Sequence, residues 1–312
     1  MNELVEAVLE SPPPGFEAGA AFVDGRTVPI GEARTSVLDR GFLRSDATYD
    51  VVGVWEGAFF RLDDHLDRFE RGCRELRLEL PHSRAEIASI LAELVRRSGL
   101  RESYVEMIAT RGVPEAGSRD PRTHANRFLA FAVPYVWLFR SDDPAAGMDA
   151  VIARTVRRIP ADSIDPTVKN FHWGDLTKAL YEAYDRGAHY PILLDHDGNV
   201  TEGPGYNVFA FVEGRLLTPE SGALEGITRR TVIELAAGAG IEVEVVALRE
   251  DTFRGGAELF ATSTAGGVMA IVSLDGDRVG DGAAGSLTRR LRDLYWEAHG
   301  DPRHTTPVSY AG

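Results

Sequence analysis

Residues 165–175 decide how the rest of the chain is interpreted, and they read Asp165-Pro166-Thr167-Val168-Lys169-Asn170-Phe171-His172-Trp173-Gly174-Asp175. A proline disfavours helix at the residue before it, so we expect this stretch to be irregular until Asp175 caps a helix. Val168, Phe171 and Trp173 surround Lys169, which predicts a partly buried lysine amine. A buried lysine in an irregular segment is a candidate nucleophile.

Lys169 is also one of only two lysines in the chain, because every other basic side chain is an arginine. A guanidinium stays protonated and cannot form an imine, whereas a lysine amine can lose its proton and attack a carbonyl. The other lysine, Lys178, lies inside the expected helix with Asp175 and Glu182 at ion-pair spacing. We therefore expect Lys169 to do chemistry and Lys178 to be a solvated structural residue.

Outward from this stretch, strands and helices are mixed without regular alternation, which favours an α+β fold over a doubly wound sheet. The turn signals Asp24-Gly25 and Glu56-Gly57 predict two hairpins. We expect a helix capped by Asp63, a second helix from about Ser83 to Arg97 that stops at Gly99, and strands over 103–110, 127–135 and 150–157. Later elements are expected at 175–186, 190–194, 200–202, 207–212, 216–218, 228–239, 241–247, 258–262 and 287–299.

This pattern divides the chain into four parts: an N-terminal arm over 1–19, a small α+β domain over 20–136, a linker over 137–148 and a larger α+β domain over 149–312. Residues 112–126 are polar and rich in Gly, Pro and Arg. They predict a long mobile loop, a kind of segment that often has a function.

Composition excludes several classes of protein. The net charge of −14 argues against nucleic acid and against an anionic membrane surface, because both require a basic footprint. The first twenty residues lack the features of a signal peptide, and no apolar run is long enough to span a membrane. Cys73 is the only cysteine. It fits a reducing compartment, so we expect a cytoplasmic protein with a buried core cysteine.

Three stretches could hold a cofactor. Glu202 precedes the rigid bend Gly203-Pro204-Gly205, although on these residues alone a turn glutamate in a hairpin is the stronger interpretation. Gly226-Ile227-Thr228 and the stretch 262–267 offer free backbone amides and hydroxyls that suit a phosphate. The histidines lack metal-ligand spacing, so no metal site is predicted.

Taken in order, these stretches resemble the class IV aminotransferases, which are pyridoxal-phosphate enzymes of fold type IV, the fold of branched-chain and D-amino-acid aminotransferases. The resemblance covers about residues 20–300 and rests on Leu38–Phe42, Arg61–Arg68, Lys169, Glu202–Asn207, Gly226–Arg229 and Ser263–Gly267. Each block is weak alone, but all of them in order are strong. The resemblance implies a two-domain α+β fold with pyridoxal 5′-phosphate between the domains.

The resemblance also implies roles for single residues. Lys169 would attach the cofactor and then shuttle a proton, Glu202 would pair with the pyridinium nitrogen, and Arg68 would hold the phosphate as a bidentate fork. Ile227, Thr228 and Thr264 would complete the phosphate cup. Ser263 would contact the cofactor and would also line the substrate side. Ala265 would line the substrate side with it.

Within the family, the stretches 45–51, 54–55, 165–176 and 262–267 are most similar to (R)-selective amine transaminases. This similarity implies that a large and a small substrate pocket are shaped by Tyr49, Val51, Tyr104, Glu106 and Trp173. An arginine of the mobile loop would bind the carboxylate of pyruvate or alanine, and we favour Arg119 over Arg122. Arg44 stands where many relatives carry histidine. It could be a second carboxylate receptor, or it could point to solvent or to a partner subunit.

The expected reaction is a ping-pong exchange, in which an (R)-amine or D-alanine donates nitrogen and a keto acid or ketone such as pyruvate accepts it. The expected assembly is a homodimer that completes each site. Three rivals stay open: a branched-chain or D-amino-acid aminotransferase, a lyase of the aminodeoxychorismate type, and a non-catalytic binding module.

Overall fold

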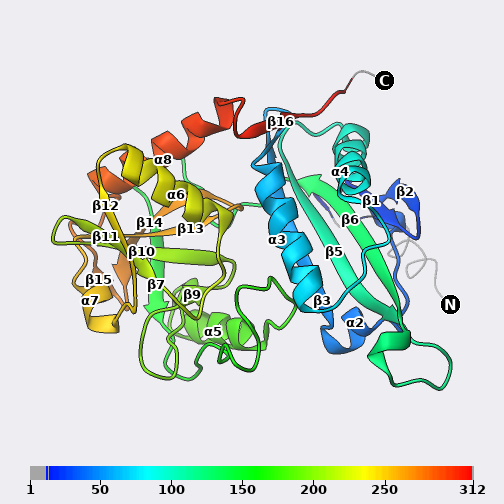
Figure 1. The fold of residues 1–312 in the computed structure, drawn as a ribbon. Helices are drawn as coiled ribbons and strands as arrows, with labels where there is room; N and C mark the ends of the chain where they lie inside the picture. The colour runs from blue at the N-terminus through cyan, green and yellow to red at the C-terminus, as the bar shows by residue number, and fades with distance from the viewer. Residues whose placement is uncertain (1–11, 13, 311–312) are drawn as a thin grey trace. The chain divides into compact units, whose positions relative to one another are not determined.

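The computed structural model describes residues 12 and 14–310 (Figure 1). Most of the expected arm, residues 1–11 and 13, lies outside the described residues. The chain forms two compact units. The first contains the residues up to Val136, the short segment Val168–Phe171 and the residues from Asp301 onward, and the second contains Trp137–Thr167 and His172–Gly300. The domain boundaries expected from the sequence stay a prediction.

The first unit is built on a seven-stranded antiparallel sheet of order β16-β4-β3-β5-β6-β1-β2. Both predicted hairpins are present in it. The elements of this unit are β1 (Ala20–Val23), β2 (Arg26–Pro29), η1 (Ile30–Glu32), α2 (Arg40–Arg44), β3 (Ala47–Trp55), β4 (Ala58–Phe60), α3 (Leu62–Glu75), α4 (Arg84–Ser98), β5 (Ser103–Val113), η2 (Pro121–Thr123), β6 (Ala125–Pro134) and β16 (Thr305–Pro307).

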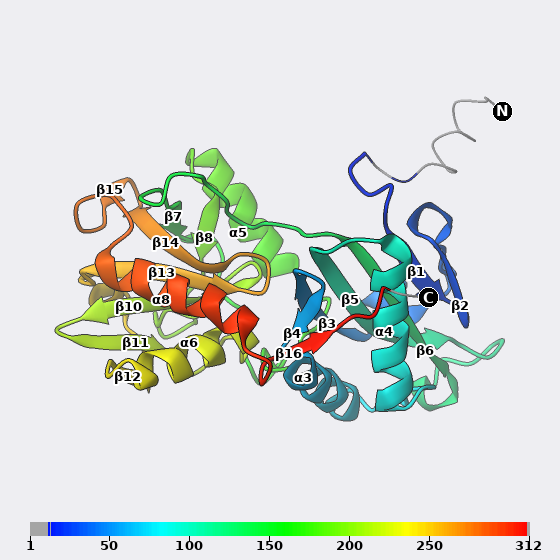
Figure 2. The ribbon, with the colours of Figure 1, turned by 90° about the horizontal axis from the view of Figure 1, so that it is seen from above.

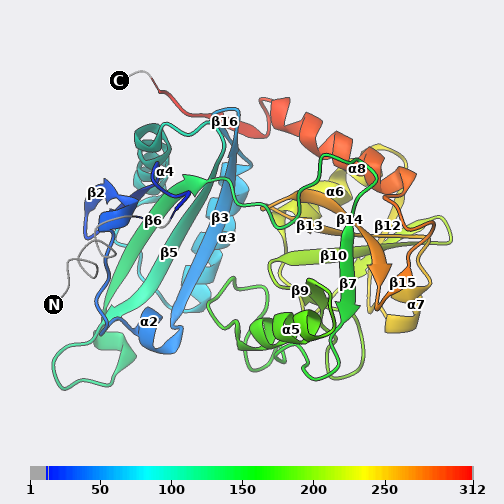
Figure 3. The ribbon, with the colours of Figure 1, turned by 180° about the vertical axis from the view of Figure 1, so that it is seen from behind.

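Helices α3 and α4 cover one face of this sheet, as Figure 2 shows. Leu66 and Phe69 of α3 and Leu91 of α4 pack against the alternate strand residues Val52 and Val105, which point to the same side because side chains alternate along a strand. The strand residues that alternate with Val52 and Val105, among them Tyr49 and Glu106, therefore point to the opposite face of the sheet. Figure 3 shows that face in front of α3.

Local signals explain the ends of these helices. Ser83 and Glu86 form a capping box at the start of α4, and Gly99 closes it in the left-handed region with a φ of 68°. The expected N-cap Asp63 was wrong. Arg61 adopts a φ of 55° and turns the chain directly into α3, so that Asp63 lies in the first helical turn, where an acidic residue favours the helix dipole.

Cys73 is buried in the core under α3, as predicted. Burial raises the pKa of its thiol to about 12, which leaves it without nucleophilic character.

The second unit contains a mixed sheet of order β12-β11-β10-β13-β14-β7-β8, with β9 paired to β10 and β15 paired to β14. Helices α6 and α8 lie together on one face and α5 lies on the other (Figure 1). The elements are β7 (Met148–Ile152), α5 (Gly174–Asp185), β8 (Tyr190–Ile192), β9 (Glu202–Gly203), β10 (Tyr206–Val212), β11 (Arg215–Pro219), α6 (Ile227–Gly238), β12 (Glu242–Val246), α7 (Glu250–Arg254), β13 (Glu258–Ser263), β14 (Gly267–Leu274), β15 (Asp277–Arg278), α8 (Ser286–Glu297) and η3 (Ala298–Gly300).

Three expectations for this unit need correction. Strand β7 ends at Ile152 and not at Arg157, because the chain leaves the sheet so that Arg158 can enter a buried ion-pair cluster. Helix α5 begins one residue earlier than expected, with Trp173 as its N-cap, and Asp175 binds Arg158 instead of capping the helix. Strand β14 was not predicted at all.

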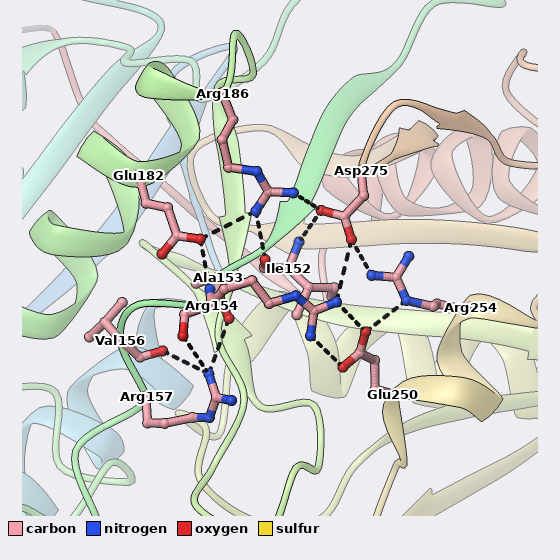
Figure 4. A network of polar contacts seen from close by, with 10 residues as sticks. All are labelled: Ile152, Ala153, Arg154, Val156, Arg157, Glu182, Arg186, Glu250, Arg254 and Asp275. Atoms are coloured by element: carbon pink, nitrogen blue, oxygen red, sulfur yellow. Dashed lines mark hydrogen bonds and ion pairs between the residues drawn. The ribbon is translucent and has the colours of Figure 1, made fainter.

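A network of ion pairs and hydrogen bonds in the second unit joins residues near the ends of β7, α5 and α7 to the turn between β14 and β15 (Figure 4). Asp275, in the turn between β14 and β15, accepts hydrogen bonds from Arg186, the residue that follows α5, from Arg254 of α7 and, at 3.1 Å, from the backbone of Ile152. Glu250 accepts from Arg154 at 2.6 and 2.8 Å. The network therefore connects two helices to the end of β7 and to one turn.

Candidate active site

The backbone of Lys169 is attached to the sheet of the first unit. Its carbonyl accepts hydrogen bonds from the Tyr49 amide at 3.0 Å and from the Thr48 hydroxyl at 2.7 Å, and Asn170 forms an isolated bridge with Thr48. Strand β4 pairs with β3 only at Val54 and Trp55, so the other end of β3 is left for this segment. A short piece of the irregular stretch therefore acts as an added strand.

The side chain of Lys169 is half-buried, as predicted. Its Nζ lies 4.5 Å from the centre of the Tyr49 ring, and that ring lies 5.0 Å from the ring of Phe171. Lys178 is exposed, but the expected ion pairs are wrong, because Asp175 binds Arg158 and Glu182 binds Arg186.

Two pocket candidates lie on the same face as Tyr49. Glu106 of β5 pairs in register with Val51 of β3, and the Tyr104 hydroxyl donates to Glu106 at 3.4 Å. Burial raises the pKa of Glu106 to about 7, and the positive charge of Lys169 and the Tyr104 hydrogen bond offset this effect only in part. Lys169, Tyr49, Val51, Tyr104 and Glu106 are thus brought together within one unit.

Arg68 belongs to a buried cluster on the helix-covered side of β3. Its Nε and Nη2 donate to the two carboxylate oxygens of Asp50 at 2.7 and 2.9 Å, and His65 Nδ1 lies 2.8 Å from Asp50 Oδ1. Burial alone would raise the pKa of Asp50, but Arg68 and His65 hold it well below its ordinary value. Burial lowers the pKa of His65 despite the nearby carboxylate, so His65 is neutral near pH 7.

Glu202 belongs to a second buried cluster, in the second unit. Arg158 Nε donates to Glu202 at 3.0 Å and Arg158 Nη1 donates to Asp175 at 2.7 Å. The other oxygen of Glu202 accepts from the Leu224 amide at 2.9 Å. All three charged side chains are buried. Arg158, Glu202 and Asp175 together carry one positive and two negative charges if both carboxylates are ionised, and Glu202 also acts electrostatically on the guanidinium of Arg229.

The bend after Glu202 is a tight hairpin turn. Gly203 pairs with Tyr206, and Gly205 between them has a φ of 84°, which fits a Pro-Gly turn. Trp173, from before α5, lies beside this turn, since a Cβ on Gly205 would be 3.8 Å from its ring. The hairpin interpretation is therefore confirmed, and the Glu202 side chain that precedes the turn is buried.

The two phosphate-cup candidates are also built in the second unit. Helix α6 begins at Ile227, and its N-cap is Gly226. A side chain at residue 226 would not fit, because its Cβ would lie 2.1 Å from Oδ1 of Asn207. Thr228 is buried with its hydroxyl 3.4 Å from the Tyr295 hydroxyl. In the other stretch, Ser263 donates to the Gly205 carbonyl at 2.8 Å and accepts from Ala265 at 3.1 Å, so Ser263 fixes the shape of the turn that carries Thr264.

The candidate carboxylate receptors are on the surface of the first unit. Arg122 pairs with Asp120 at 2.6 Å. Arg44 and Arg119 are exposed, and among the described residues neither forms a hydrogen bond or ion pair. Of the three, Arg44 and Arg119 are thus the ones available to a ligand.

Sequence reasoning missed Asp50, His65, Arg158 and Asp175, which hold Arg68 and Glu202. One signal was available: Asp50 is a charge inside the apolar run of β3, and such a charge needs a buried partner. His65 offers no comparable signal, because the spacing of the histidines does not indicate a metal site. Arg158 had no signal, because its partners lie 17 and 44 residues away.

Within residues 12 and 14–310, no group of three or more His, Cys, Asp or Glu side chains could hold a metal ion. The helices of the same residues are all too short or too polar to cross a membrane.

The family description "Amino-transferase class IV" matches residues 47–274. The chain belongs to the class IV aminotransferases. A Methanocaldococcus jannaschii protein provisionally named a branched-chain-amino-acid aminotransferase is 31% identical over 278 residues, which cover 88% of this class IV aminotransferase and 94% of that protein. The D-alanine aminotransferase of Bacillus licheniformis is 30% identical over 277 residues, with coverage of 86% and 93%.

Solved structures agree with the sequence relatives. A branched-chain amino acid aminotransferase from T.th. with pyridoxamine 5′-phosphate matches with a TM-score of 0.87 at 30% identity, covering 94% of this chain and 100% of that chain. The predicted mixed α+β fold of type IV is therefore confirmed. Another structure of that protein holds a phosphopyridoxyl-glutamate adduct. These relatives support pyridoxal 5′-phosphate as the cofactor of this class IV aminotransferase.

The described residues fit that cofactor chemically. Lys169 supplies a half-buried amine beside aromatic rings, and Arg68 supplies a buried guanidinium. The Glu202 cluster carries more buried negative than positive charge, which suits a protonated ring nitrogen.

Proposed function

We propose that this class IV aminotransferase moves an amino group between an (R)-amine or D-alanine and a keto acid or ketone such as pyruvate. One observation supports an amine donor most directly. The side chains grouped around Lys169 in the first unit are aromatic and acidic, namely Tyr49, Tyr104 and Glu106. Such a surface favours apolar substituents over a carboxylate.

Each cofactor role is proposed on the family resemblance and on local geometry. When bound, pyridoxal phosphate supplies an electron sink that makes the substrate Cα acidic. Lys169 would hold the cofactor and would then move the proton at the substrate Cα. Glu202, held by Arg158 and the Leu224 amide, keeps the ring nitrogen protonated.

The phosphate is assigned to Arg68, Ile227, Thr228, Ser263 and Thr264. Arg68 is oriented by its two hydrogen bonds to Asp50, which occupy Nε and Nη2, so a bidentate contact with the phosphate would use the other edge of the guanidinium. The amides that begin α6 receive no side-chain cap from Gly226, and free amides at a helix start suit a phosphate.

For the substrate, we propose that Tyr49, Val51, Tyr104, Glu106, Trp173 and Ala265 sort substituents by size, and that Arg119 receives the carboxylate of the keto acid. Arg119→Ala should weaken the half-reaction with pyruvate far more than the half-reaction with (R)-1-phenylethylamine. Arg122→Ala is the matched control, since Arg122 already pairs with Asp120. Equal losses in both half-reactions of the Arg119 variant would move the role to Arg44.

We further propose a homodimer in the cytoplasm. The segment before and within α2 exposes four large apolar side chains: Val37 at 68%, Leu38 at 57%, Phe42 at 67% and Leu43 at 49%. A cluster of this kind on a monomer suggests an interface. Phe42→Ser should weaken the dimer in analytical ultracentrifugation, and an unchanged dimer would place the interface elsewhere.

A branched-chain or D-amino-acid aminotransferase is the alternative that the names of the relatives favour. We would separate the two functions by mixing the holoenzyme with (R)-1-phenylethylamine, its mirror image, D-alanine and L-leucine, and by following the cofactor spectrum. Loss of the visible band with the (R)-amine supports the proposal, and loss with amino acids alone supports the alternative. An aminodeoxychorismate-type lyase would instead release pyruvate by elimination.

Lys169→Ala should abolish transamination, because no other described residue of this face offers an amine. We expect a loss of at least about a thousandfold, together with loss of the covalently held cofactor spectrum. Lys178→Ala, which removes the only other lysine from an exposed position, should leave both unchanged. Retained turnover in the Lys169 variant would refute the assignment.

A further inference from the structure

Glu106 shares its face of the sheet with the reactive lysine. Glu106 lies on β5 and pairs with Val51 of β3. Tyr49, two residues before Val51, has its ring centre 4.5 Å from Nζ of Lys169. The charge of Lys169 acts on Glu106 strongly enough to influence its pKa. A negative charge is therefore held close to the place where a substrate nitrogen would react.

The surroundings of Glu106 let it change charge near neutral pH. Lys169 and Asp50 act on it electrostatically, and Tyr104, on which Tyr49 acts in turn, donates a hydrogen bond to it. Its partner on β6 is the uncharged Phe131. Burial is the largest influence and raises the pKa of Glu106 to about 7. The carboxyl group is neutral below this pH and ionised above it.

We propose that Glu106 is a specificity-determining residue whose carboxylate excludes a substrate carboxylate from its side of the site, and so decides which enantiomer of an amino acid reacts. The proposal rests on the proposed function, because it takes Lys169 as the residue at which the substrate reacts.

The physical reason is that two enantiomers exchange the positions of two substituents around the reacting carbon. One enantiomer of alanine must place its carboxylate toward Glu106, where two like charges in a partly buried site repel each other. An amine such as 1-phenylethylamine has no charged substituent, so its enantiomers are sorted by size alone. The effect should therefore depend on pH for amino acids and not for such amines.

The test compares kcat/KM of the holoenzyme for the two enantiomers of alanine between pH 6 and pH 8.5. The ratio cancels the ionisation of the substrate itself. We expect the preference to rise by about tenfold across this range in the wild type. In Glu106→Gln the preference should be low and flat. Glu102→Gln, an exposed glutamate just before the same strand, is the matched control and should behave as the wild type.

Two further readouts make the test specific. The preference between 1-phenylethylamine enantiomers should not change with pH in any variant. Infrared difference spectra between pH 6 and pH 8.5 should show a carboxyl band that Glu106→Gln lacks, which reports the ionisation without turnover. A flat alanine ratio in the wild type, the same slope in Glu106→Gln, or the absence of that band would each overturn the proposal.

Failure of the proposed function looks different. If the amine is not a substrate but alanine or leucine enantiomers are, the proposed function fails, and the amino-acid ratio still decides the role of Glu106. If Lys169→Ala keeps its activity, the site itself is wrong and both proposals fall together.

Discussion

Each unit contains one buried arginine held by carboxylates, and the two arrangements are opposite. In the first unit one carboxylate, Asp50, serves both Arg68 and His65. In the second unit one arginine, Arg158, serves both Glu202 and Asp175. With a neutral His65 the charges of Asp50 and Arg68 balance, whereas Glu202 and Asp175 share the single charge of Arg158, with Arg229 as a more distant cation that Glu202 influences. The difference indicates which cluster can accept a cation and which only orients a guanidinium.

The largest effect is expected from a substitution of Glu202 in the second cluster. Glu202→Gln neutralises the second cluster, so a ring nitrogen near it should lose its proton. We expect kcat to fall by about a hundredfold or more, and the cofactor spectrum to shift. Asp175→Asn changes the charge of the cluster equally but leaves Glu202 in place. If both variants lose the same activity, the net charge matters and the position of Glu202 does not.

A substitution in the first cluster should lower the free energy of unfolding of the protein. Asp50→Asn removes the carboxylate charge that binds two nitrogens of the buried Arg68 guanidinium, and breaking such a buried pair typically costs about 3–5 kcal/mol. The free energy of unfolding, measured in denaturant, should recover in the double variant Asp50→Asn with Arg68→Met. If the single variant is as stable as the wild type, water or another group already compensates Arg68.

The same cluster should make the first unit sensitive to acid. The folded pKa of His65 lies below its ordinary value of 6.5, so the unfolded chain binds the proton more readily. The contribution of His65 to stability is therefore present above pH 6.5 and is lost as the pH falls from there toward the folded pKa. Thermal unfolding of His65→Gln should vary less with pH between 6.5 and 5. An identical slope would mean that His65 is not the group responsible.

The partly exposed network around Asp275 should matter least. Glu250→Gln removes the carboxylate that binds Arg154 and Arg254, and solvent screening limits the expected loss to about 0.5–1 kcal/mol. Added salt should reduce the difference in unfolding free energy between wild type and variant. A loss as large as that of Asp50→Asn would show that burial is not what separates these clusters.

Sequence reasoning located the elements whose signals are local. The Asp24-Gly25 and Glu56-Gly57 turns, the end of the second helix at Gly99 and the Pro-Gly bend after Glu202 are each determined by a few neighbouring residues. Sequence reasoning failed where the structure of a segment depends on residues that are far away in the sequence. Strand β16 has three residues and is a strand only because β4 lies beside it, and Asp175 left its expected cap because Arg158 offered a buried partner.

The site shows the same division. The blocks that identify the family predicted Lys169, Glu202 and Arg68 as one set, and their roles stay proposals. The residues that orient Arg68 and Glu202 carry no local signature, since Asp50 and Arg158 look like ordinary charges until the strands are paired.

The attachment of Lys169 to β3 has a consequence for how the molecule is made. Its carbonyl is bonded to Thr48, 121 residues earlier in the chain, and the edge strand β16 of the same sheet is supplied by residues 305–307. A ribosome must therefore synthesise almost the whole polypeptide before this sheet is complete. A nascent fragment that ends at residue 136 would contain both covering helices and every strand of the sheet except β16, yet it would contain no lysine. Until residue 169 is added, the growing chain therefore has no lysine side chain that could form an imine with a carbonyl compound.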